Sequence, residues 1–197
     1  MDRKRGTIRL YSAQRAEILN ILERDGSCYS KEQFINRKYD ESARIFLTAY
    51  EWLAREGARF VPKPEKAGLH YWAFTEYIEL EASYGDPVLV MDVPLSECLF
   101  FNIFDWSKIL RLEYIGENED EERKFREKTK AYGIKHASAI MLGNFYPELN
   151  REIENSWQRL FRYHDPISSG ERPITTIEAA LWQIKKSWIS DIITKTK

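Results

Sequence analysis

Polar side chains set among aromatic rings are the residues of this sequence that could do chemistry. Glu178 is the only acid in the apolar segment Ile174–Ile184, and an isolated carboxylate in a predicted strand calls for an explanation. Trp52 lies nearly opposite the apolar stripe of its predicted helix, so it either packs under a second layer or faces a ligand cleft. The same mixture of polar and aromatic residues recurs at Leu10-Tyr11-Ser12-Ala13-Gln14, Tyr50-Glu51-Trp52, Tyr71-Trp72-Ala73-Phe74, Phe104-Asp105-Trp106, Ser156-Trp157 with Leu160-Phe161, and Ile177-Glu178-Ala179-Ala180-Leu181-Trp182.

None of the common catalytic or phosphate-binding motifs accompanies this pattern. The sequence contains no GxGxxG, GxxxxGK, HExxH or GxSxG, and its nine glycines weaken a phosphate-loop interpretation. His70, His136 and His164 lack metal-ligand spacing, so we expect no structural metal. Cys28 and Cys98 are far apart and predict two free thiols in a reducing compartment. A Ser/His/Asp or Cys/His site stays open, because the sequence alone does not bring its members together.

Composition predicts one folded domain. Apolar residues make up 43% and aromatic residues 14% of the 197 residues, which excludes global disorder and suffices for a real core. Lys and Arg number 30 against 31 Asp and Glu, which argues against a general nucleic-acid coat protein but leaves a local basic cleft open. We expect residues 1–197 to form a single domain with a flexible tail at 1–6. No signal peptide or membrane span is visible, so we expect a cytoplasmic location.

The elements that must position the candidate residues begin with a strand over 7–11. Ser12 is predicted to cap the helix that follows, which runs to about Arg24 and is stopped by Asp25-Gly26. A second helix is predicted over 42–56. β-forming residues favour extended structure over 69–80, and the apolar run at 88–91 suits a buried strand.

The second half of the chain predicts more helix and one late strand. Asn102 is expected to cap a helix that runs to about Leu112. Acids followed by bases over 117–131 complement a helix macrodipole and form i,i+4 pairs, which indicates an exposed helix rather than a nucleic-acid site. Pro147 opens a further helix. A loop over 165–173 then leads to a strand over 174–184, and the whole order predicts an α+β fold.

In order and approximate spacing, the six polar and aromatic segments resemble an uncharacterised bacterial family, domain-of-unknown-function family 3841, over about residues 8–185. Members typically carry Ser-Asp before the Phe of the fourth segment, where this chain has Phe101-Asn102. Members often carry Gln where this chain has Glu178. These two departures favour a binding protein over an enzyme.

The opening segment also looks like the first strand of ADP-ribosyltransferases of the DarT toxin type, which reads Leu-Tyr-His-x-Thr before a helix ending in Gly. Ser12 stands where those enzymes have His. Their late strand carries a Gln-Ala-Glu segment, in which Glu178 matches the Gln and Ala180 matches the catalytic glutamate. Glu178 could therefore serve only through a small register shift. The resemblance implies small mixed or antiparallel sheets around a cleft with helices outside, and strand 7–11 beside strand 174–184.

This second resemblance implies an enzyme that uses NAD to modify a macromolecule, in a bacterial toxin or phage-defence setting. The expected partners are nucleic acid as the acceptor and a cognate antitoxin protein. Departure of nicotinamide passes through an oxocarbenium-like state that a carboxylate stabilises, and Glu178 is the catalytic candidate. Ser12 and Gln14 are the candidates for binding the ribose, and Trp52 and Trp72 are those for stacking on the nicotinamide. Arg59 is the candidate for neutralising the diphosphate.

The alternative is a non-catalytic protein that keeps the fold and binds a ligand or a partner, as an antitoxin or another component of such a system would. In this interpretation Glu178 is a surface strand residue, Trp72 belongs to the core, and Gln14 lies on the first turn of the opening helix. The two hypotheses differ in one structural respect, which is whether the candidate residues share one pocket.

Overall fold

Eight strands form two antiparallel sheets in the described residues, 6–30, 43–77 and 86–194 of the computed structural model. The larger sheet has the order β5-β6-β3-β1-β4-β8. In that order the bounds are Leu99–Asn102, Ile177–Leu181, Tyr71–Phe74, Thr7–Ala13, Pro87–Pro94 and Ile189–Thr194. The smaller sheet pairs β2 (Ser27–Tyr29) with β7 (Gln183–Lys185).

The larger sheet has two apolar faces, because successive side chains of a strand point to opposite sides. Leu10 belongs to the side covered by α1 (Glu17–Asp25) and the β2–β7 pair, which we call the α1 face. Trp72 and Leu99 belong to the opposite side, which packs with α3 (Ala43–Gly57) and which we call the α3 face. Strands β3, β5 and β6 therefore contribute to two cores, whereas β1 and β4 contribute to the core on the α1 face.

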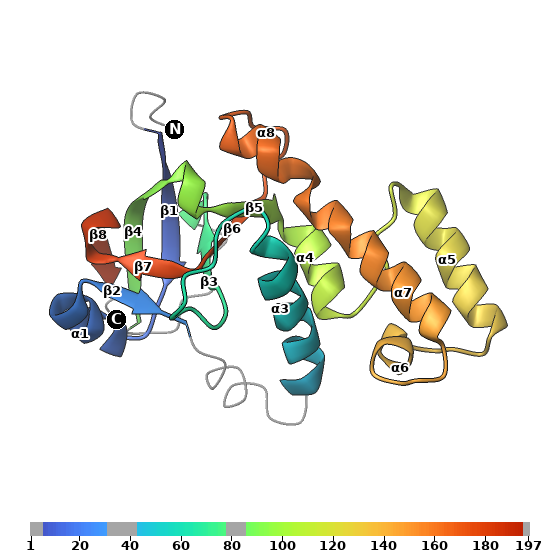
Figure 1. Ribbon diagram of the computed structural model, residues 1–197. Helices are drawn as coiled ribbons and strands as arrows, with labels where there is room; N and C mark the ends of the chain where they lie inside the picture. The colour runs from blue at the N-terminus through green and yellow to red at the C-terminus, as the bar shows by residue number, and fades with distance from the viewer. Residues whose placement is uncertain (1–5, 31–42, 78–85, 195–197) are drawn as a thin grey trace.

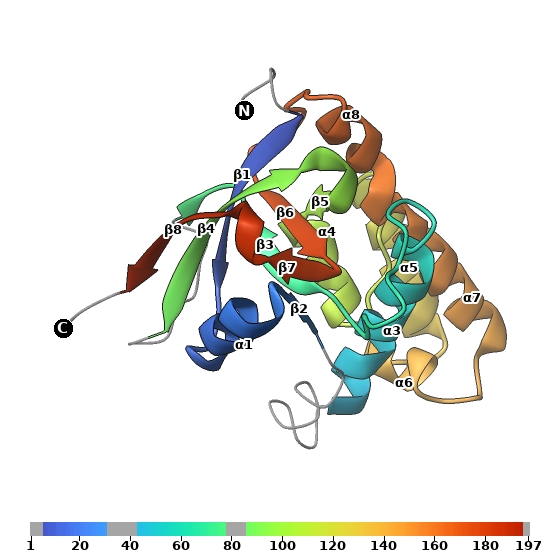
Figure 2. The ribbon, with the colours of Figure 1, turned by 60° about the vertical axis from the view of Figure 1, so that its left-hand side comes forward.

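The helices that follow β5 form the opposite end of the molecule, and residues 103–163 are here called the helical region. It contains α4 (Ile103–Leu110), α5 (Glu119–Ala131), α6 (Ala137–Met141) and α7 (Pro147–Ser156), which continues as the 3-10 helix η4 (Trp157–Tyr163). α8 (His164–Ser168) then returns to β5. Figures 1 and 2 show α5, α6 and α7 extending away from the sheet, with β8 at the far end. No helix in the described part of the chain is long and apolar enough to cross a membrane.

Several helix ends lie where the sequence predicts them. The Asn102 side chain accepts a hydrogen bond from the Phe104 amide at 2.8 Å and caps α4. Gly26 ends α1 in the left-handed region with φ 72°, a conformation that costs glycine little. Pro147 opens α7, and Asp120 pairs with Lys124 at 2.9 Å on α5. The predicted α+β class and single domain are confirmed, and Cys28 and Cys98 are buried free thiols.

Other predictions are wrong in ways that matter for the site. Ser12 does not cap a helix, because β1 continues to Ala13, which pairs with Val88, and α1 begins only at Glu17. The opening strand does not lie beside the late strand, because β3 runs between β1 and β6. The predicted late strand is divided at Trp182 into β6 and β7, and the predicted loop over 165–173 begins as α8. The predicted extended segment holds β3, and its residues 78–80, like most of the predicted tail, lie outside the described residues.

Candidate functional site

Three neighbouring strands carry three of the six candidate residues. β1 holds Ser12, β3 holds Trp72 and β6 holds Glu178, and these strands are adjacent in that order. The sheet thus brings together segments that are more than a hundred residues apart in sequence. Adjacent strands alone do not make a site, however, because each strand has two faces.

Ser12 and Glu178 lie on opposite faces of this sheet. Tyr11 pairs with Phe74, and Phe74 pairs with Glu178, so the side chains of Tyr11 and Glu178 point to the same side. Ser12 follows Tyr11 and therefore points to the other side, toward the α1 face that contains Leu10. One ribose cannot contact both side chains in this arrangement.

Ser12 and Gln14 form a chain of hydrogen bonds that links β1 to β3. The buried Ser12 hydroxyl donates to the Trp72 carbonyl oxygen at 2.5 Å. The Gln14 amide then donates to the Ser12 hydroxyl oxygen at 2.7 Å. Both side chains therefore satisfy buried polar atoms next to the strand pair, which is a structural use of their hydrogen-bonding groups.

Trp72 belongs to an aromatic cluster on the α3 face. Its indole nitrogen donates to the Tyr50 hydroxyl at 3.1 Å, and its ring lies 5.1 Å from that of Trp106. Phe101, which pairs with Glu178 across β5 and β6, completes the cluster at 6.2 Å from Trp72. Three of the polar and aromatic segments thus meet here, between the sheet and helices α3 and α4.

Trp52 and Arg59 are placed elsewhere. Trp52 is only 2% exposed and packs against the rings of Trp157 at 5.3 Å and Phe161 at 5.6 Å, so neither face of its indole is open to a ligand. The Arg59 guanidinium is exposed and pairs with the Glu56 carboxylate at 2.6 Å. Burial acts to raise the pKa of Glu56, but hydrogen bonds from Arg55 and Gln158 and the charges of Arg55 and Arg59 lower it overall.

Glu178 is buried, at 4% exposure, in the middle of β6. Its lateral neighbours on β3 and β5 are Phe74 and Phe101. The expectation of an exposed strand residue is therefore wrong. Glu178 and Trp72 share the α3 face, since Trp72 lies two residues from Phe74 along β3.

His70 is a buried polar residue whose spacing in the sequence indicates only that it is a poor metal ligand. It is 4% exposed, stacks on Trp182 with ring centroids 3.7 Å apart, and neither ring nitrogen has a hydrogen-bond partner among the described residues. Burial, and next the charge of Lys63, lower the pKa of His70 to about 3, so its imidazole is neutral. Its place directly before a β-rich, aromatic segment is the signal that could have predicted burial.

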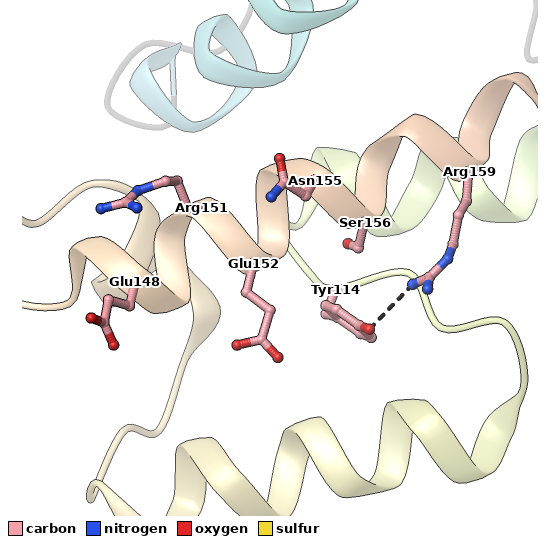
Figure 3. A pocket seen from close by; sticks show the side chains of 7 residues that line it. All are labelled: Tyr114, Glu148, Arg151, Glu152, Asn155, Ser156 and Arg159. Atoms are coloured by element: carbon pink, nitrogen blue, oxygen red, sulfur yellow. Dashed lines mark hydrogen bonds between the residues drawn. The ribbon is translucent and has the colours of Figure 1, made fainter.

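Two hollows lie in the helical region, and neither is lined by a candidate residue. The first, of about 490 Å³, lies along α7 and is lined by charged side chains on both sides of Ser156, with Arg159 turned toward the Tyr114 hydroxyl (Figure 3). The second has a volume of about 610 Å³, and we call it the helical groove. Its large apolar lining residues are Ile45, Phe46, Leu110, Phe125, Ile134 and Ile140, and Ala137 also lines it.

Ion pairs hold α5 over the groove. The Lys108 ammonium contacts the Glu122 carboxylate at 2.5 Å, and the Gly116 amide donates to the same carboxylate at 3.2 Å. Burial acts to raise the pKa of Glu122, but these two hydrogen bonds and the Lys108 and Arg126 charges lower it overall. Gly116 has no room for a side chain here, since an added Cβ would lie 2.5 Å from the Glu122 Cγ.

A comparison with family models finds a match over residues 9–190 to a family described as a domain of unknown function, DUF3841. No curated protein matches the chain, and no solved structure matches it. The described residues contain no group of three or more His, Cys, Asp and Glu side chains placed to hold a metal ion.

Proposed function

The chain belongs to the DUF3841 family, whose description names no activity, and we propose from the geometry that it is a non-catalytic binding protein. The sheet serves as the scaffold, and the helical groove between α3, α4, α5 and α6 receives the ligand or partner segment. In the bacterial toxin or phage-defence setting that the weaker resemblance to ADP-ribosyltransferases implies, such a protein acts as an antitoxin or another partner-binding component.

The observation that carries this proposal is the division of the candidate residues. Ser12 and Glu178 point to opposite faces, and Trp52 is enclosed by other rings. Groups that must act on one bound molecule have to converge within hydrogen-bonding distance of it. These side chains do not converge, whereas the groove presents an open, mixed apolar and polar surface of a volume typical for ligand sites.

Anilinonaphthalene sulfonate is a suitable probe, because its aromatic rings and single anionic group match the apolar and cationic lining of the groove. We expect saturable binding to the folded protein with one site, seen as a rise in dye fluorescence. Ala137 lines the groove, so Ala137→Trp should fill it and abolish dye binding without lowering the melting temperature.

Ala139→Trp is the matched control, since Ala139 is exposed on the same short helix and does not line the groove. Dye binding that is equal in both variants, or absent from the wild type, would contradict the proposal. Circular dichroism of each variant distinguishes loss of the groove from loss of the fold.

An NAD-dependent ADP-ribosyltransferase is the second candidate, and one observation favours it. Glu178 and Trp72 lie on one face of adjacent strands, so a carboxylate and an indole are close to each other. If Glu178 stabilises an oxocarbenium-like state, Glu178→Gln should slow nicotinamide release from NAD by about 10²–10³. Trp72→Ala should abolish NAD binding in calorimetry. No heat at about 1 mM NAD and no nicotinamide release, with or without nucleic acid as acceptor, would remove this candidate.

A further inference from the structure

We infer that the occupant of the helical groove is an acidic amphipathic helix of a partner protein, an inference that rests on the proposed function. The groove has three properties that together select this occupant: an excess of positive charge, an apolar lining from several helices, and exposed aromatic rings next to it.

The charged lining of the groove is predominantly basic. Four cationic side chains, Lys108, Arg111, Arg126 and Lys135, stand against two carboxylates, Glu113 and Glu122. Glu122 is shared by Lys108 at 2.5 Å and Arg126 at 3.8 Å, and Glu113 holds Arg111 at 2.9 Å. Both carboxylates are therefore already in ion pairs with groove residues. Lys135 makes no ion pair within the described part of the chain. Two positive charges are left for an anionic partner.

The apolar lining comes from separate helices, which makes a trough rather than a closed cavity. Ile45 comes from α3, Leu110 from α4, Phe125 from α5 and Ile140 from α6. A helix docks in such a trough with apolar side chains at positions i, i+3 or i+4, and i+7. Acidic residues on the flanks of that helix would then face the cationic rim.

Exposed aromatic rings extend this surface beyond the groove. Tyr132, at the end of α5, is 59% exposed, and Phe145, just before α7, is 87% exposed. The ring of Tyr146, which follows Phe145 in the sequence, lies 6.3 Å from that of Tyr132. Aromatic residues are enriched at the centres of protein–protein interfaces, and large exposed rings beside an apolar groove indicate a protein partner.

The charges fit a peptide better than a nucleic acid. A nucleic-acid site needs a continuous basic stripe that neutralises several phosphates. Here two carboxylates interrupt the rim, and the chain as a whole has a net charge of -1. An amphipathic helix needs only a few cationic contacts along its flanks, which the rim provides.

The test uses two synthetic amphipathic peptides of about four helical turns with identical leucine positions. One carries Glu and the other Lys on its polar face. Fluorescence anisotropy should show that the Glu peptide binds at least about tenfold more tightly near 0.1 M salt, and that the difference shrinks as salt rises. Lys135→Glu should reduce binding of the Glu peptide about tenfold, while Lys130→Glu, an exposed change on α5 outside the groove, should leave it unchanged.

Each outcome separates this inference from the proposed function. Equal binding of both peptides, or binding of a single-stranded oligonucleotide instead of the Glu peptide, would overturn the acidic helix. If the naphthalene dye binds in the groove and neither peptide does, the groove is a site for a small apolar anion and the inference is wrong. If the dye does not bind either, the proposed function itself fails.

Discussion

The sheet and the helical region use polar residues in different ways. In the sheet, Ser12 and Trp182 donate to backbone carbonyls from buried positions, and His70 stacks on an indole ring. In the helical region, ion pairs such as Lys108–Glu122 and Lys128–Glu152 join the helices at partly exposed positions. These three polar groups beside the sheet are shielded from solvent, whereas the helical region leaves hollows between ion-paired helices. Buried aromatic and polar residues therefore mark the interior of this protein, and its binding surface is to be sought elsewhere.

The largest expected effect comes from a fully buried ring rather than from one that borders the groove. Trp52→Ala removes a ring held between Trp157 and Phe161, so it should lower the free energy of unfolding by about 3–5 kcal/mol. Phe125→Ala should cost less, because Phe125 stacks on Tyr114 but also borders the groove. Urea unfolding of both variants measures the difference in the free energy of unfolding. Equal losses for Trp52→Ala and Phe125→Ala would contradict the distinction between the buried ring and the ring that borders the groove.

Mild acid should weaken the sheet before the helical region. His70 has a folded pKa of about 3, below its usual value, so protonation favours the unfolded chain as pH falls below about 6.5. The cost is about 1.4 kcal/mol per pH unit, or about 2 kcal/mol near pH 5. The lowered pKa of Glu122 in the helical region acts only at more acid pH, because its stabilisation is lost as pH falls through that folded value.

Urea unfolding at pH 7.5 and pH 5 checks this prediction, with His70→Phe as the comparison variant. Phe keeps a ring on Trp182 but cannot take up a proton, so its stability should change less over this range. His164, whose pKa is also lowered by burial, contributes in the same direction and remains in both proteins. A wild type and a His70→Phe variant with the same pH dependence would contradict the assignment to His70.

Two helix caps offer a matched pair of variants, and the expected loss of stability is of intermediate size. Asn102 caps α4 beside the sheet and Asn118 caps α5, with accepted amide hydrogen bonds of 2.8 Å and 3.0 Å. Replacing either residue by Ala should cost about 1 kcal/mol. Hydrogen exchange should show that Asn118→Ala increases opening of α5 alone, whereas Asn102→Ala affects a helix that shares the sheet's core. Exchange that rises across the whole protein in both variants would mean that the regions unfold as one unit.

The smallest effect concerns the ion pair between α5 and α7. The Lys128 ammonium lies 2.5 Å from the Glu152 carboxylate, but both side chains are well exposed. Glu152→Gln should therefore cost only about 0.5 kcal/mol after allowance for solvent screening, and the loss should vanish near 1 M salt. Melting temperatures at low and high salt measure it. A loss that persists at high salt would show that the helices depend on this contact for more than its charge.

Local signals in the sequence predict much of the fold. The features that they do not predict depend on pairing between strands that are far apart in the sequence. Asn102, Pro147 and Gly26 act through their own backbone neighbourhood, so their places at helix ends follow from residue type. Ser12 was assigned to a cap because Ser favours that position, but pairing of β1 with β4 extends the strand past it. No local pattern reveals such pairing.

The candidate site failed for a related reason. Residue types and spacing predict polar and aromatic positions along three strands, but they do not determine the register between those strands. Glu178 faces the side of Tyr11 only because Phe74 lies between them in the pairing. A shift by one residue would have turned Glu178 toward Ser12. Trp52, left open between core and cleft, lies in the core because η4 returns over α3, which is a tertiary contact.

The strand order has a consequence for how the chain folds. β6 inserts between β3 and β5, and β8 pairs with β4, so residues 177–194 complete a sheet begun at residue 7. During synthesis, β3, β4 and β5 each keep an open edge until β6 and β8 leave the ribosome. Such non-local pairing slows folding and exposes apolar strands meanwhile. A nascent chain is therefore expected to need chaperone protection until β6 and β8 are made, although the helical region folds early from local contacts.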